Sequence, residues 1–179
     1  ELGQLTRVVD AADGVTRFDY QYGRPTKKTA PDGLETTYQC NHAGELVSVR
    51  RASGATFSLS RDERGRVTAI DGPFGRLVEY TYDSQSNVVA EVDGCGRRTS
   101  FHYDAMGRPV ARTDADDRVT RIQYDALGRR TAVTLPDTTS TLFRYDEMGK
   151  VRERIDRNGG KWVYRHEGMG VLTELTEPS

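Results

Sequence analysis

Hydrophobic and polar residues alternate along many short stretches of this chain. Between Leu77 and Tyr82, Val78 and Tyr80 fall on the same side as Tyr82, and Leu77 falls on the other side with polar neighbours. The same spacing recurs at Thr99, Phe101 and Tyr103, at Thr120, Ile122 and Tyr124, and at Thr141, Phe143 and Tyr145. A period of two with β-branched and aromatic residues is typical of β-strands. No window holds a period of 3.6, so we expect an all-β fold with almost no helix.

Two series of glycines recur every 21 residues. The first comprises Gly23, Gly44, Gly65, Gly107, Gly128, Gly149 and Gly170, with Ser86 in the remaining position. The second comprises Gly33, Gly54, Gly75, Gly96 and Gly159, with Asp117 and Thr138 in the same register. Self-similarity at a fixed period indicates a repeat architecture. We expect about eight β-hairpin units forming one array over residues 1–179.

A motif of the form Tyr-Asp-x-x-Gly-Arg surrounds the first glycine series. Its residues are Tyr82, Asp83, Tyr103, Asp104, Gly107, Arg108, Tyr124, Asp125, Gly128, Arg129, Tyr145, Asp146, Gly149 and Lys150. Degenerate copies begin at Cys40, Arg61 and His166. A period of 21 predicts that the motif tyrosines lie side by side on one face of a sheet, two strand spacings or roughly 9–10 Å apart.

The motif also predicts the turns. Its aspartate can accept a hydrogen bond from the backbone N–H two residues on, and its glycine supplies a positive φ. At the opposite ends of the strands, Asp32-Gly33 and Asn158-Gly159 are strong hairpin dipeptides. We expect looser turns at Asp117 and Thr138, where the glycine is lost. In the returning strands the alternation fails, which indicates either burial of both faces or a β-bulge that shifts the parity.

Composition limits the classes of protein that remain. The usual apolar set makes up about 40% of the chain, which argues against one compact core of normal size. Fifteen aromatic residues and a net charge of −1 argue against disorder and against nucleic acid as a partner. No apolar run is long enough to cross a membrane, so membrane insertion is not expected. The absence of a leader-like segment suggests a slice of a longer protein.

These residues resemble the YD repeat of the Rhs family, which includes bacterial Rhs toxins, the B and C components of insecticidal toxin complexes, and the teneurins. The copies at Tyr103–Arg108 and Tyr124–Arg129 carry the resemblance best. It implies a long antiparallel sheet that spirals into a hollow shell. Independently, roughly 16 strands about 4.8 Å apart exceed what a twisted open sheet holds without curling.

The resemblance also implies a function. The shell of that family encloses a C-terminal toxin or cargo domain, so the expected partners are the rest of the shell and that domain. A secretion-system spike and a chaperone would bind elsewhere, and delivery would be to the cell surface or outside. No Asp-Pro-x-Gly autocleavage region is visible and no toxin domain follows Gly170. We therefore expect a structural, non-enzymatic segment that self-associates through its exposed sheet edges when isolated.

Catalytic and metal-binding alternatives find little support. Asp83, Asp104, Asp125 and Asp146 could act as acids or bind calcium, but four identical positions are better explained as turn caps, beside the cationic Arg108, Arg129 and Lys150. His42, His102 and His166 lack the spacing of metal ligands. Cys40 occupies a tyrosine position, where it should pack as a small apolar residue. Cys95 lies in an opposite turn, too far from Cys40 for a disulfide. We therefore expect no catalytic residue, metal or cofactor.

Two further alternatives concern binding and architecture. The pairs Arg50-Arg51, Arg97-Arg98 and Arg129-Arg130 could bind phosphate or acidic glycans, but interspersed aspartates favour a solvated surface of mixed charge. An aromatic ladder, formed by Tyr80, Phe101, Ile122, Phe143 and Tyr164, could bind sugars or stack across strands. A surface module that binds glycans is therefore the alternative function. The alternative fold is a propeller built of two units per blade, although its usual signatures are missing.

Overall fold

A computed structural model of the chain describes residues 3–167 and 171–177 and contains only strands and turns over this range. The strands are β1 (Arg7–Val9), β2 (Val15–Gln21), β3 (Arg24–Thr29), β4 (Glu35–Cys40), β5 (Leu46–Arg50), β6 (Thr56–Arg61), β7 (Val67–Gly72), β8 (Gly75–Tyr82), β9 (Val88–Asp93), β10 (Arg98–Tyr103), β11 (Pro109–Thr113), β12 (Val119–Tyr124), β13 (Arg130–Thr134), β14 (Ser140–Tyr145), β15 (Val151–Ile155), β16 (Lys161–Glu167) and β17 (Val171–Thr176). The expected all-β fold is confirmed. Gly170 of the first glycine series lies outside the described residues.

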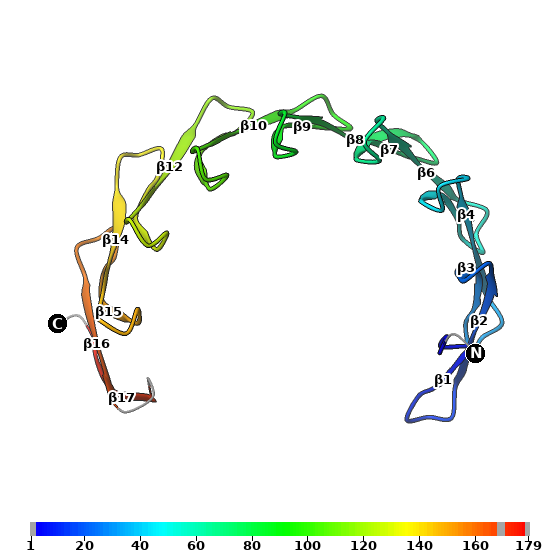
Figure 1. Ribbon diagram of the computed structural model, residues 1–179, viewed down its shortest axis with the longest axis horizontal. Helices are drawn as coiled ribbons and strands as arrows, with labels where there is room; N and C mark the ends of the chain where they lie inside the picture. Colours follow the sequence, from blue (N-terminus) through cyan, green and yellow to red (C-terminus); the bar gives the residue numbers. More distant parts are fainter. Residues whose placement is uncertain (1–2, 168–170, 178–179) are drawn as a thin grey trace. The chain divides into compact units, whose positions relative to one another are not determined.

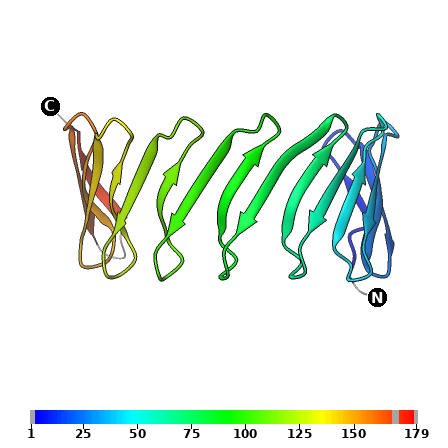
Figure 2. The same cartoon turned by 90° about the horizontal axis from the view of Figure 1, so that it is seen from above.

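Within each unit the strands pair as one continuous antiparallel sheet, which excludes the separate blades of a propeller. The chain divides into two compact units, Glu1–Thr81 with Glu91–Arg97 (unit 1) and Tyr82–Ala90 with Arg98–Ser179 (unit 2). In unit 1, strands β1 to β8 pair in chain order. In unit 2, strands β10 to β17 do the same (Figure 1). Successive turns alternate between the two ends of the strands (Figure 2).

Except between β2 and β3 and between β7 and β8, the described turns at both ends of the strands share one three-residue loop. At Asp104, the Gly107 N–H donates to the Asp104 carbonyl (2.9 Å), and the Asp104 N–H donates to the Arg108 carbonyl (3.0 Å). Gly107 has a φ of 75°. This is a type I turn closed by a residue in the left-handed region, one of the common hairpin loops. The dipeptides expected to form short hairpin turns are part of this longer loop, as the Gly33 N–H bond to the Ala30 carbonyl (2.9 Å) shows.

The expectation of looser turns at Asp117 and Thr138 is wrong. These residues have φ values of 59° and 69°, so they adopt the conformation of the missing glycine. The Thr138 N–H still donates to the Leu135 carbonyl (2.9 Å), and the Leu135 N–H still donates to the Thr139 carbonyl (2.8 Å). Two backbone bonds hold the turn tightly enough to offset the cost of about 1–2 kcal/mol that a side chain adds in the left-handed region.

Two turns contain only two residues, one between β7 and β8 and one between β2 and β3, where the first repeat lacks one residue. Between β2 and β3, Gln21 lies directly opposite Arg24. The two residues between them, Tyr22 and Gly23, have φ values of 51° and 81°. Two consecutive positive φ values define a two-residue type I′ turn, which suits the twist of a hairpin. The deletion is thus absorbed in a turn, and the register of the strands is preserved.

A β-bulge accounts for the broken alternation of the returning strands. His102 lies opposite Ala111 and Tyr103 opposite Pro109, so Val110 is left without a direct partner. The same shift recurs at Gln39/Cys40, Ser60/Arg61, Gln123/Tyr124 and Arg144/Tyr145. The other explanation also holds in part, because β7 and β9 contain no exposed residue. These bulges fall beside the motif tyrosine position, where a bulge re-aims a side chain, and a further shift lies at Ile70/Asp71 between β7 and β8.

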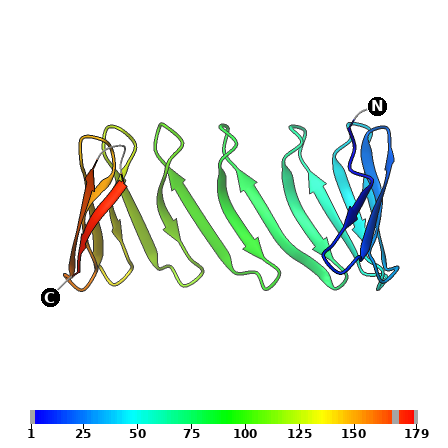
Figure 3. The ribbon, with the colours of Figure 1, turned by 90° about the horizontal axis from the view of Figure 1, so that it is seen from below.

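Each unit is a single layer of sheet. Within each unit, no described segment of that unit packs over either face of its sheet (Figure 3). Among the described residues, only Ala69, Ala90 and Ala132 bury their surface almost fully, with 4%, 1% and 6% exposed. Ala132 owes this to its position directly between Gln123 and Leu142 on neighbouring strands. Stabilisation therefore comes from contacts between adjacent strands rather than from a core between layers.

The aromatic ladder is not a direct aromatic stack. The strand between two ladder strands contributes a residue of another type, and in unit 2 Val133 lies opposite Ile122 and Arg154 lies opposite Phe143. Arg154 in turn lies opposite Trp162, with its guanidinium 4.9 Å from the ring centroid. The ladder residues on β10, β12, β14 and β16 are half-buried, which fits cross-strand packing with aliphatic and cationic neighbours.

The first strand should make the isolated chain associate. β1 contacts only β2 within the described residues, and Val8 and Val9 are 40% and 47% exposed. Unpaired backbone groups on such an edge template pairing with another chain. We expect the 179-residue chain to form dimers or larger species as its concentration rises in light scattering. Val8→Lys together with Val9→Lys should shift the onset to higher concentration, whereas a matched Leu34→Lys change in a turn should not. A wild-type chain that stays monomeric would contradict this prediction.

Candidate functional site

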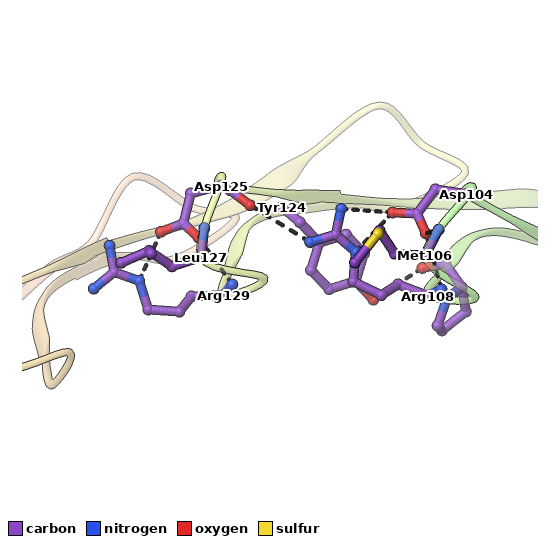
Figure 4. Close-up of polar contacts among 8 residues, drawn as sticks. Asp104, Met106, Arg108, Tyr124, Asp125, Leu127 and Arg129 are labelled. Carbon is purple, nitrogen blue, oxygen red and sulfur yellow. Dashed lines mark hydrogen bonds and ion pairs between the residues drawn. The ribbon is translucent and has the colours of Figure 1, made fainter.

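The motif aspartates cap their own turns. The Oδ1 atom of Asp104 accepts the backbone N–H groups of Met106 (2.9 Å) and Arg108 (3.0 Å). Asp125 does the same with Leu127 (3.0 Å) and Arg129 (2.9 Å). Figure 4 shows both turns. The bond to the residue two positions on confirms the expected cap, and the bond to the residue four positions on was not expected. The acid–base candidates are therefore held by backbone amides.

The other carboxylate oxygen binds the arginine of the same motif. Asp104 and Arg108 form an ion pair at 2.7 Å, and Asp125 and Arg129 form one at 2.7 Å. The Arg108 backbone N–H, helped by its guanidinium, holds the pKa of Asp104 below its ordinary value. The same groups of Arg129 lower the pKa of Asp125. The carboxylates therefore remain charged at neutral pH and are poor proton donors.

The arginine then reaches the tyrosine of the next repeat. The Arg108 guanidinium lies 4.7 Å from the centroid of the Tyr124 ring, and the Arg129 guanidinium lies 4.6 Å from that of Tyr145. Arg108 also approaches the Asp125 carbonyl, with Nη1 at 3.5 Å. Cation–π contacts at such distances contribute about 0.5–1 kcal/mol at exposed sites. The arginine thus links the turn of its own hairpin to the next hairpin (Figure 4).

The tyrosine hydroxyl completes the link with a backbone bond. Tyr124 donates to the Pro109 carbonyl (2.9 Å), and Tyr145 donates to the Arg130 carbonyl (2.7 Å). Tyr103 donates to the Val88 carbonyl (2.8 Å), and burial together with the Asp83 charge raises the pKa of Tyr103. In each case the acceptor is 15 residues earlier. We call the set Asp104, Arg108 and Tyr124, with the Pro109 carbonyl, and its equivalents a clasp.

Variant repeats preserve the clasp by exchanging partners. Asn87 stands in the arginine position and donates through Nδ2 to Asp83 Oδ2 (2.9 Å). Asn41 and Glu45 reverse the polarity, because Asn41 Nδ2 donates to the Glu45 carboxylate (2.8 Å). Arg61 replaces the tyrosine and donates to the carbonyl of Leu46 (3.1 Å), again 15 residues earlier. Arg61 thus supplies the donor to that carbonyl that tyrosine supplies in other repeats.

The last motif copy departs from this pattern. The Lys150 backbone N–H caps Asp146 (2.8 Å), and His166 Nδ1 lies 3.6 Å from an Asp146 carboxylate oxygen. His166 occupies the tyrosine position and its side chain is only 13% exposed. Of the three motif cations named from the sequence, Arg108 and Arg129 thus pair with the aspartates of their own motifs.

A second set of caps was missed from the sequence. Asp93 and Asp114 cap the opposite turns and pair with Arg97 (2.7 Å) and Arg118 (3.1 Å). Asp156 accepts the Gly160 N–H (2.8 Å) in the same way. The signal was present, because these aspartates lie in the 21-residue register and three positions before the second glycine series. Both ends of the strands thus use one capping device.

The remaining candidates do not form a reactive group. Within residues 3–167 and 171–177, no three His, Cys, Asp or Glu side chains gather as metal ligands would. Cys40 and Cys95 are free and exposed, so the interpretation of Cys40 as a packing residue is wrong. Arg97 and Arg129 are paired within their own turns, and Arg51 lies over the Phe57 ring at 4.8 Å. No helix in the described residues is long and apolar enough to cross a membrane.

Chemically, the clasp can join hairpins but does not activate a nucleophile. Its carboxylates accept hydrogen bonds from backbone amides and guanidinium groups. Its tyrosine hydroxyls donate hydrogen bonds to carbonyls, and its tyrosine rings contact guanidinium groups. Because these partners satisfy one another, the arrangement has no free general base or acid of the kind that catalysis needs. Its physical effect is to fix each hairpin to the next one.

Known proteins share this fold. Segments of the Tc holotoxin pore of Photorhabdus luminescens match with a TM-score of 0.79 and 13% identity, over 92% of this chain and 11% of that one. A crystal structure of TcdB2–TccC3 matches with a TM-score of 0.79 and 15% identity, over 98% of this chain and 12% of that one. At such identities the likeness concerns the fold alone.

Comparison of sequences also finds relatives of this chain. The double-stranded DNA deaminase toxin A of Burkholderia cenocepacia (strain H111) is 37% identical over 60 residues, covering 34% of this chain and 4% of that protein. This chain thus spans a small part of the proteins that it matches. The sequence model of the RHS Repeat family matches residues 1–33, 21–56, 61–94, 94–119, 103–140 and 124–161. Because these matches cover most of its length, the chain belongs to the RHS repeat family.

Proposed function

We propose that this array is a structural, non-enzymatic segment of a β-shell that encloses a C-terminal toxin or other cargo domain. The observation that carries the proposal is the clasp, which repeats from hairpin to hairpin and engages its titratable groups in structural contacts. A shell built of hairpins needs strong contacts between neighbouring hairpins along its whole length, and the repeated clasps supply such contacts. Containment would be the mechanism, since a wall keeps a toxic domain away from the cell that makes it.

The relatives support the choice of cargo. Two matched structures belong to toxin complexes, and the matched curated protein is named as a toxin. Each of these chains is far longer than this array, which leaves room for further wall and for an enclosed domain. The partners would then be the rest of the shell and the cargo. A secretion-system spike and a chaperone would bind other parts, and the product would be secreted or delivered at the cell surface.

Limited proteolysis of the full-length gene product tests containment. The cargo should be digested slowly while the wall is intact. Combining Tyr103→Ala, Tyr124→Ala and Tyr145→Ala should open the wall, and we expect cargo cleavage to become at least about tenfold faster, as for a change of about 1.4 kcal/mol in the opening equilibrium. Tyr22→Ala, in a turn outside the clasps, is the matched control. Equally fast cargo digestion in the unmodified protein and the triple variant would overturn the proposal.

A further inference from the structure

One clasp in unit 1 lacks its tyrosine, and a groove lies in its place. The groove has a volume of about 410 Å³, within the range of small-molecule sites. Its lining includes Tyr22, Arg24, Pro25, Tyr38, Cys40 and Val47. Cys40 occupies the motif tyrosine position, and a thiol is far smaller than a phenol ring. The groove thus includes Arg24, Pro25 and Val47 beside the position that a tyrosine ring fills in other repeats.

A complete copy of the clasp exists four repeats later. Arg24 and Pro25 correspond to Arg108 and Pro109, and Cys40 corresponds to Tyr124. In the complete copy the Tyr124 hydroxyl donates to the Pro109 carbonyl at 2.9 Å, below the Arg108 guanidinium at 4.7 Å. In the described part of the chain, no side chain donates to the Pro25 carbonyl. The groove therefore retains the acceptor and the cation of a clasp without the ring between them.

The Arg24 guanidinium also has few polar partners. The shortened turn removes the aspartate that would precede it, and within the described residues Arg24 forms no ion pair. Its guanidinium lies over Gly44, where a Cβ atom would clash, and Nη2 donates to the Ala43 carbonyl at 3.2 Å. The cation is thus held beside the groove by a single neutral acceptor, so it can interact with the face of an added ring.

An occupied clasp has a hollow in the same place, but the positions that correspond to Arg24 and Pro25 do not line it. A hollow of about 350 Å³ beside Tyr103 is lined by that tyrosine but not by Asn87 or Val88, which correspond to Arg24 and Pro25. At the remaining non-tyrosine positions, Arg61 donates to the Leu46 carbonyl, and the His166 side chain is 13% exposed. Among these repeats, only the Cys40 repeat has a hollow lined by the arginine position and by the residue whose carbonyl accepts the tyrosine hydroxyl.

We propose that this groove binds a para-substituted phenol. The ligand hydroxyl donates to the Pro25 carbonyl, and its ring lies under the Arg24 guanidinium beside Cys40 and Val47. The para substituent leaves the groove where the tyrosine Cβ would be. A free phenol and the tyrosine side chain of a peptide share this chemistry, and both reproduce the contacts of Tyr124 in the complete clasp.

Alkylation of the two cysteines provides an internal control. Both thiols are exposed, but only Cys40 lines the groove. Saturating p-cresol should slow the reaction of Cys40 with iodoacetamide several-fold and leave the rate at Cys95 unchanged, as measured by mass spectrometry of the 179-residue chain. The methyl ether of p-cresol, which cannot donate, should require about tenfold more ligand for the same protection. N-acetyltyrosinamide and N-acetylphenylalaninamide form a second pair of probes with and without a hydroxyl. This pair tests whether the tyrosine side chain of a peptide binds the groove.

Variants decide whether the site is the one described. Cys40→Tyr should supply the missing ring and abolish p-cresol binding in ligand-detected NMR, whereas Cys95→Ala should leave it intact. Arg24→Gln removes the cation while leaving the groove, and should weaken binding about threefold to fivefold. Because Arg24 is an exposed residue, Arg24→Gln tests the site even if Cys40→Tyr fails to fold. Equal protection of both cysteines, or equal binding of p-cresol and its methyl ether, would overturn the proposal.

Discussion

Replacing Tyr124 by alanine should lower the free energy of unfolding by about 2–3 kcal/mol. The change removes a half-buried ring, its contact with Arg108, and the hydroxyl that donates to the Pro109 carbonyl. A fully buried aromatic would cost more, but no second layer covers this ring. Urea unfolding followed by circular dichroism, at a concentration below the onset of association, measures the effect.

Two further variants separate the contributions at this position. Tyr124→Phe keeps the ring and loses only the donor, so it should cost about 1 kcal/mol. Tyr22→Ala removes a tyrosine that is 93% exposed in a turn, and should change stability by less than about 0.5 kcal/mol. A Tyr124→Ala variant as stable as Tyr22→Ala would show that the clasp does not join the hairpins.

Acid should unfold the array over a pH range that begins near 4. The carboxyl groups with lowered pKa values are Asp62, Asp93, Asp104, Asp114, Asp125, Asp137, Glu153 and Asp156. A carboxyl whose pKa is lower in the folded state stabilises the fold fully above its unfolded pKa, about 3.9 for Asp. That stabilisation is lost as the pH falls through the lower folded values. Because many groups act together, the decline in stability should be steep.

The measurement is a series of urea midpoints between pH 7 and pH 2. Asp125→Asn keeps an oxygen for the turn amides but cannot ionise, so it should be less stable at pH 7 and show a shallower decline below pH 4. Glu63→Gln, at an exposed turn position, is the matched control and should follow the unmodified chain. A stability that stays constant down to pH 2 would contradict the shifts in carboxyl pKa.

Local features of the fold could be predicted from the sequence because their causes are local. The alternation through Tyr82, the glycine series and the Asp104 cap each depend on residues within one hairpin. Period and turn chemistry agree there, which is the condition under which a sequence specifies a structure. The same reasoning failed at Thr138, where two backbone bonds, rather than the residue type, determine the turn.

The clasp could not be predicted because it joins residues of different hairpins. The Tyr124 hydroxyl meets the carbonyl of Pro109 on the neighbouring strand β11, next to the bulge that leaves Val110 without a direct partner. The sequence left a bulge and two buried faces as alternatives, so the target of the hydroxyl was undetermined. The groove at Cys40 was missed for the same reason, since an empty tyrosine position has meaning only once the partners of a filled one are known.

The short reach of the clasp has a consequence for biosynthesis. Each tyrosine hydroxyl bonds a carbonyl only 15 residues earlier, as Tyr103, Tyr124 and Tyr145 show. Contacts so close in sequence carry a small loop-closure cost and favour rapid folding. A hairpin leaving the ribosome can therefore dock onto the one made just before it, without waiting for distant parts of the chain. Growth from the N-terminus, one hairpin at a time, would leave a single advancing sheet edge exposed during translation.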